Sequence, residues 1–121
     1  MDVPAQAIRT LMEIGVAASC MGLHRPAMDI FQGIGAVRPD SDGPVIGVAL
    51  AHISNHSPEE AVKLLRTHVL SKDPGNMDAK MILGVALKLA GRNAECDSVI
   101  KELNATGDSR AKAFAASLAA R

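Results

Sequence analysis

The chain has 121 residues, of which 48% are hydrophobic and 2% aromatic, and its 13 basic and 13 acidic residues cancel. This length predicts a single domain with one modest core. The balanced charge, without a basic block and almost without aromatic surface for base stacking, argues against a nucleic-acid partner. The core must be aliphatic, and the high helix propensity of alanine favours an all-α fold.

The number and spacing of the cysteines and the hydropathy of the chain indicate where in the cell the protein is expected. Cys20 and Cys96 are far apart and show no CxxC spacing, so they do not suggest a disulfide scaffold and suit a reducing environment. The opening MDVPAQAIRT lacks the pattern of a secretory signal, and no segment reaches the roughly 20 apolar residues that cross a bilayer. We therefore expect a cytoplasmic protein without membrane insertion.

Hydrophobic spacing predicts helices from the start of the chain. Apolar residues at helical intervals predict a first helix over 4–21, which Gly22 is expected to end in a left-handed cap. A second helix is expected over 26–38, where an Arg-Pro-Asp segment stops it. The turn-forming segment 40–44 then leads into a third helix.

The fourth helix has the clearest start signal. Ser57 is followed by Pro58 and, three residues on, by Glu60. This arrangement predicts a capping box, in which the serine hydroxyl accepts a hydrogen bond from the glutamate N–H.

The last three helices follow the same rules. Asn76 is expected to cap the fifth helix, and Gly91 to break the chain before the sixth. After a turn over 104–108, the Ala-rich segment 110–121 predicts a helix that caps an open end of the fold.

Small and apolar residues recur at spacings of 34 and 35 residues. The matching positions are Gly15, Ala49 and Gly84; Ala27, Ala61 and Cys96; and Pro39 and Pro74. Such a period is typical of stacked helical hairpins. The sequence therefore predicts an all-α helical-hairpin solenoid in one domain, 1–121. It consists of three degenerate repeats, at about 8–41, 42–76 and 77–106, and a C-terminal capping helix at about 108–121.

These positions resemble the tetratricopeptide repeat. In a first unit starting at Ile8, Gly15, Ala27, Phe31 and Pro39 fall at positions 8, 20, 24 and 32 of that repeat. The aromatic residues usual at positions 4 and 11 are replaced, so the units are degenerate. The replacements are Leu11, Ala18, Val45, His52, Lys80 and Leu87.

The whole chain also resembles the small repeat-type chaperones of bacterial type III secretion, virulence systems whose needle or pilus subunits are held in the cytoplasm before export. The resemblance lies in the length, in the segment LMEIGVAASCMG at 11–22, in the Arg38-Pro39 turn, and in the ending IKELNATGDSRAKAFAASL. It implies a needle or pilus subunit as partner and a small helical co-chaperone beside it.

The tetratricopeptide resemblance implies that the first helix of each unit lines a concave face. At the positions expected there, this chain carries apolar side chains. The predicted groove residues are Met12, Val16, Ile46, Leu50, Ile53, Met81, Val85 and Leu89. An apolar strip of this kind marks a site for an amphipathic helix, unless the same side chains are buried as core.

We therefore predict a chaperone that binds an amphipathic helix of a needle or pilus subunit and prevents its premature polymerisation. Two alternatives stay open. The first is a general tetratricopeptide scaffold that joins other proteins, and the second is a homo-oligomer that buries the same groove. A soluble, stable monomer would favour the scaffold.

No enzyme, metal site or cofactor is expected. The pair His52 and His56 lacks further ligands, and the segment 40–43 lacks the later acidic residues of a calcium loop. Neither cysteine has a histidine at a spacing that suggests a nucleophile, and Glu59 and Glu60 suit a helix start.

Overall fold

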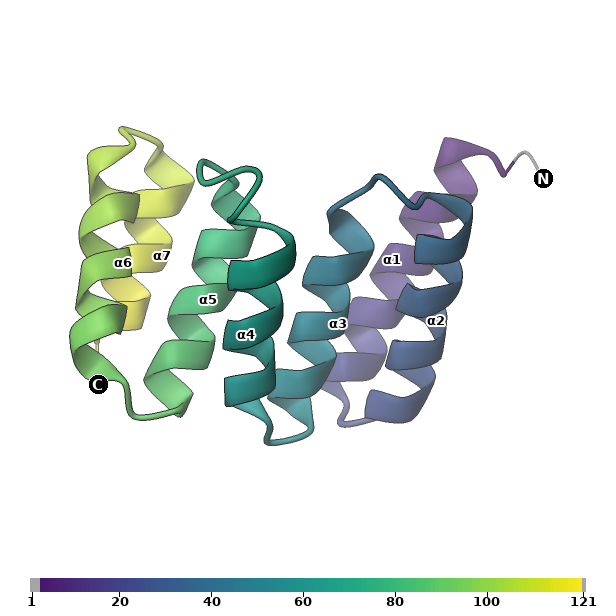
Figure 1. The fold of residues 1–121 in the computed structure, drawn as a ribbon, viewed down its shortest axis with the longest axis horizontal. Helices are drawn as coiled ribbons and strands as arrows, with labels where there is room; N and C mark the ends of the chain where they lie inside the picture. Colours follow the sequence, from purple (N-terminus) through teal and green to yellow (C-terminus); the bar gives the residue numbers. More distant parts are fainter. Residues whose placement is uncertain (1–2, 121) are drawn as a thin grey trace.

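The computed structural model describes residues 3–120, which form seven α-helices and no strand. The helices are α1 (Ala5–Cys20), α2 (His24–Val37), α3 (Gly43–Ser54), α4 (Pro58–His68), α5 (Met77–Leu89), α6 (Asn93–Ala105) and α7 (Ser109–Ala119). Successive hairpins follow one another along the length of the molecule, with α1 and α2 at one end and α6 and α7 at the other (Figure 1). Consecutive helices pack against each other throughout, which confirms the predicted all-α arrangement of helical hairpins.

The turns inside the three hairpins each contain one residue in the left-handed backbone conformation, and these residues occupy equivalent positions of the repeat. Gly22 has a φ of 78°, and the N–H of Leu23 bonds to the carbonyl of Ala18 at 2.8 Å. This bond ends α1 in the predicted left-handed cap. Gly91 has a φ of 77°, and His56 has a φ of 59° at the equivalent place between α3 and α4. His56 therefore belongs to a turn of the repeat, where most side chains are disfavoured.

The two predicted side-chain caps have different outcomes. Asn76 accepts a hydrogen bond from the N–H of Ala79 at 3.0 Å, as expected. The capping box at Ser57 is wrong, because its hydroxyl donates to the carbonyl of Asn55 at 3.4 Å. With a ψ of 59°, Ser57 presents its backbone carbonyl to the N–H of Glu60 at 3.2 Å.

The helices form two layers. In one, α1 contacts α3, α3 contacts α5, and α5 contacts α7. In the other, α2, α4 and α6 contact their neighbours in sequence but not one another. The first helix of each hairpin, together with α7, therefore presents one continuous face.

Buried side chains gather in two clusters. The larger extends from α3 to α7 and includes Leu65, Leu87 and Leu103, each with 0% exposure. The smaller lies between α1, α2 and α3 around Phe31, whose side chain is also fully buried. The ring of Phe31 lies against two glycines, because a Cβ added at Gly15 or Gly47 would come within 2.6 or 2.4 Å of its atoms.

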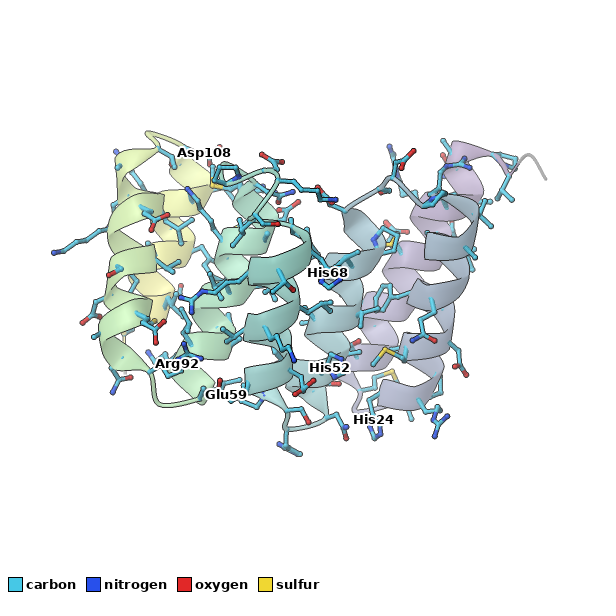
Figure 2. The ribbon with its side chains drawn as sticks, in the orientation of Figure 1. His24, His52, Glu59, His68, Arg92 and Asp108 are labelled. Carbon is cyan, nitrogen blue, oxygen red and sulfur yellow. The ribbon has the colours of Figure 1, made fainter. Side chains whose placement is uncertain are left out.

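Charged side chains bridge α4 and α6, which do not otherwise pack together. Arg92 donates to Glu95 at 2.6 Å and to Glu59 at 2.7 Å, and Arg66 reaches Glu95 at 2.8 Å. Figure 2 shows Glu59 and Arg92 at the same end of these helices. The hydrogen bond from Arg92, followed by that from Arg66, lowers the pKa of Glu95 from 4.5 to about 2.

This network predicts a pH-dependent contribution to stability. Because the folded pKa of Glu95 lies below its unfolded value, the contribution is complete above about pH 4.5 and is lost as the pH falls toward 2. Urea unfolding of the wild type and of Glu95→Gln measures it. We expect a constant difference in free energy of unfolding down to about pH 5.5 and a shrinking difference below it. A difference that stays unchanged to about pH 3 would contradict the assignment.

Candidate functional site: an apolar groove on α1, α3, α5 and α7

An open groove of about 600 Å³ crosses the layer of first helices. Its lining residues are Met12 and Val16 of α1; Gly43, Ile46, Gly47 and Leu50 of α3; Asp78, Met81 and Ile82 of α5; and Arg110, Ala113, Phe114 and Ser117 of α7. No residue of α2, α4 or α6 takes part. We call this surface the apolar groove.

The apolar groove is assembled from side chains one helical turn apart. Met12 and Val16 are separated by four residues, as are Ile46 and Leu50, so each pair lies on one face of its helix. Val16 is 39% exposed, Ile46 and Leu50 are half-buried, and Met81 forms a floor that is only 8% exposed. The surface is thus partly core and partly accessible to a partner.

The structure brings together part of the predicted set. Met12, Val16, Ile46, Leu50 and Met81 all line the apolar groove.

The remaining predicted residues, Ile53, Val85 and Leu89, do not line the apolar groove. Ile53 and Val85 pack against the larger core cluster, and Leu89 is 60% exposed at the end of α5. They lie further along α3 and α5 than the residues that line the groove. Leu118 of α7 packs over Gly84, since a Cβ added at Gly84 would come within 2.5 Å of the leucine methyl group.

The contribution of α7 was missed by sequence reasoning, which assigned this helix only to capping. Phe114 is half-buried and lines the apolar groove from α7, and Ile82 of α5, also missed, lines it as well. The signal was available in the spacing of Arg110, Ala113 and Phe114, which repeats the i, i+3, i+4 pattern of a helix face.

Two features hold α7 in place. Asp108 caps its start by accepting a hydrogen bond from the N–H of Ala111 at 3.0 Å. At its other end, the ammonium group of Lys88 donates to the carbonyls of Leu118 and Ala120. A cation at a helix C-terminus satisfies free carbonyls and interacts favourably with the helix dipole.

One edge of the apolar groove is polar. Arg110 donates to Asp78 at 3.4 Å, with both side chains more than 60% exposed, and Ser117 lies on the same helix as Arg110. An exposed ion pair of this kind adds little stability. Its position gives the groove an apolar interior and a charged rim.

Residues with catalytic or metal-binding chemistry are dispersed. Across residues 3–120, no three His, Cys, Asp or Glu side chains gather as metal ligands. His24, His52 and His68 come from α2, α3 and α4 (Figure 2).

The two cysteines differ in environment. Cys20 is exposed, whereas Cys96 is buried and donates its thiol to the carbonyl of Gly84 at 3.5 Å. Burial raises the pKa of the Cys96 thiol, which favours the unreactive protonated form.

Within residues 3–120, no helix combines the length and hydropathy needed to span a bilayer. Comparison with known proteins finds no matching family model, no similar curated protein and no similar solved structure.

Proposed function

We propose that this protein is a non-catalytic cytoplasmic chaperone whose apolar groove binds one face of an amphipathic helix. The observation that carries the proposal is the gathering of aliphatic and aromatic side chains from four helices on one open surface. An apolar groove of this shape suits a helix that contributes anchors at i, i+3, i+4 and i+7.

The distribution of polar groups favours a helix over a small molecule. Sites for small ligands place several polar groups in converging positions inside the cavity. Here Asp78, Arg110 and Ser117 lie together on α5 and α7, and the other lining side chains are apolar or glycine. Such a rim fits a partner that is apolar on one face and polar on the next.

We further propose that the bound helix belongs to a secretion needle or pilus subunit, which would polymerise if its apolar face stayed exposed. This part of the proposal rests on the resemblance of the segments 11–22 and 100–118 to type III secretion chaperones. A small helical co-chaperone is the second partner that this resemblance implies.

Photocrosslinking in the native host tests the proposal. A benzophenone side chain placed at Val16 would stand in the apolar groove, and one placed at Leu89 serves as a matched control on the exposed end of α5. We expect the probe at Val16 to capture a secretion subunit and the probe at Leu89 not to capture it.

Other results would favour other functions. Crosslinks from Val16 to a second copy of this chain would indicate a homo-oligomer that buries the groove. Crosslinks to stable, non-exported proteins would indicate a scaffold. The same proteins captured from both positions would contradict binding in the apolar groove.

A further inference from the structure

The last helix of the apolar groove is attached to the rest of the fold by few large side chains. Among the helices of residues 3–120, α7 contacts α5 and α6 alone. The residues that it buries are Ala111, Ala115 and Leu118, and Leu118 packs over Gly84 of α5. Because alanine buries little apolar area, hydrophobic docking of α7 depends mainly on Leu118 and on the half-buried Phe114.

A lysine of α5 adds a polar attachment at the end of α7. Lys88 corresponds to Ile53 of α3, at the spacing of 35 residues that also separates Ala61 from Cys96. Ile53 packs against the larger core cluster, whereas the ammonium group of Lys88 donates to the carbonyls of Leu118 and, at 2.6 Å, Ala120. These carbonyls belong to the last turn of α7, where a helix offers them no N–H partner of its own. The junction of α5 and α7 therefore uses a hydrogen-bonding cation where α3 places an aliphatic side chain on the core.

This attachment lies one helical turn from the aromatic residue of the apolar groove. Phe114 and Leu118 are four residues apart, so they lie on the same side of α7, about 6 Å apart along its axis. A helix end that loses the partner of its free carbonyls frays over its last turn, and here that turn follows directly on Phe114. We propose that Lys88 is a positioning residue for the apolar groove: its ammonium group docks the end of α7 and so holds Phe114 in the groove.

Lys88 acts through α7, because it does not line the apolar groove itself. It lines a separate cavity of about 320 Å³, together with Cys96 and Asp97 of α6. Its replacement should therefore leave the walls that α1 and α3 contribute unchanged. The inference rests on the proposed function for its consequence in partner binding, whereas the position of Phe114 can be measured in the free protein.

Fluorine NMR of the free, full chain labelled with para-fluorophenylalanine tests the position of Phe114. The sequence contains two phenylalanines, Phe31 and Phe114, so two resonances are expected. Lys88→Met removes the ammonium group and keeps an unbranched side chain. It should shift the Phe114 resonance toward its value in the unfolded protein and leave that of the fully buried Phe31 unchanged. Lys88→Arg, which keeps a cationic donor, should restore the wild-type position.

Lys112→Met is the matched control, because it removes the same charge from α7 itself at an exposed position. It should leave both resonances in place. Hydrogen exchange of the amides of α7 should become at least about fivefold faster in Lys88→Met and stay unchanged in Lys112→Met. An unmoved Phe114 resonance in Lys88→Met, an equal shift in Lys112→Met, or a shift of both phenylalanines would overturn the positioning role.

The protein captured by the probe at Val16 then tests the consequence for binding. Lys88→Met should raise its dissociation constant about three- to tenfold, and Lys88→Arg should not. Combined with Phe114→Ala, Lys88→Met should add less than it does alone, because both changes remove the same contact. An unchanged dissociation constant, or fully independent effects, would overturn the inference and leave the proposed function in place. A failure to capture any protein at Val16 would contradict the proposed function, and the fluorine spectra alone would then decide the role of Lys88.

Discussion

Replacing Phe31 with alanine is expected to lower the free energy of unfolding by about 3–5 kcal/mol. The side chain is fully buried and is the largest in the cluster that joins α1, α2 and α3. Two of its neighbours are the glycines Gly15 and Gly47, and the buried ones in its cluster are alanines, so few side chains could fill the space that the ring would leave. The cavity would therefore persist, and the full cost of a large-to-small substitution should appear.

Denaturant unfolding measures this loss, and Gly33→Ala supplies the control on the same helix. A Cβ at Gly33 would meet no atom within 4 Å, so this change should stabilise α2 by up to about 1 kcal/mol. A loss below about 1 kcal/mol for Phe31→Ala would show that the N-terminal hairpin does not depend on this ring.

The substitution Leu50→Asp is expected to weaken binding of the helical partner by about 2–4 kcal/mol. Leu50 lies on α3, between the walls that α1 and α5 contribute to the apolar groove. A bound apolar helix would cover the new carboxylate and leave it without water or a counter-charge, which is costly.

The same substitution should leave the helical circular dichroism spectrum unchanged, because Leu50 is half-buried rather than fully buried in the free protein. Loss of helical signal would instead assign Leu50 to the core, which is the alternative that its sequence pattern left open.

Local signals in the sequence predicted much of this fold. Gly22 and Asn76 end and begin helices as expected, because these caps depend on residues within one turn. The close packing at Gly15 and Gly84 also follows from their repeat position. By contrast, the capping box at Ser57 failed because the preceding left-handed turn at His56 sets the backbone direction.

Packing between distant residues could not be predicted in the same way. The repeat register matched Gly15 with Ala49, yet the second glycine against Phe31 is Gly47. Ala49 instead lies in the larger cluster with 0% exposure. The repeat spacing shows which residues of the three units are equivalent. It does not show which residue must be a glycine, because that depends on where the ring of Phe31 lies against the backbone of a neighbouring helix.

The apolar groove was predicted only in part, because its extent also depends on packing between helices that are distant in the sequence. Apolar spacing identified the faces of α1, α3 and α5, but it could not show where along those helices the surface stays uncovered. That depends on α7, which packs over Gly84 and brings Phe114 to the apolar groove. Apolar spacing alone therefore assigned Ile53, Val85 and Leu89 to a groove that does not reach them.

The most direct test of the central claim is a titration of the captured partner into the wild type, Leu50→Asp and Leu89→Asp. Both variants introduce the same carboxylate, but only Leu50 lines the apolar groove, and Leu89 is 60% exposed outside it. We expect binding to the wild type and to Leu89→Asp with similar affinity, and a loss of about 30-fold or more for Leu50→Asp. Equal affinity for all three proteins, or a loss confined to Leu89→Asp, would contradict the claim that this groove holds the partner.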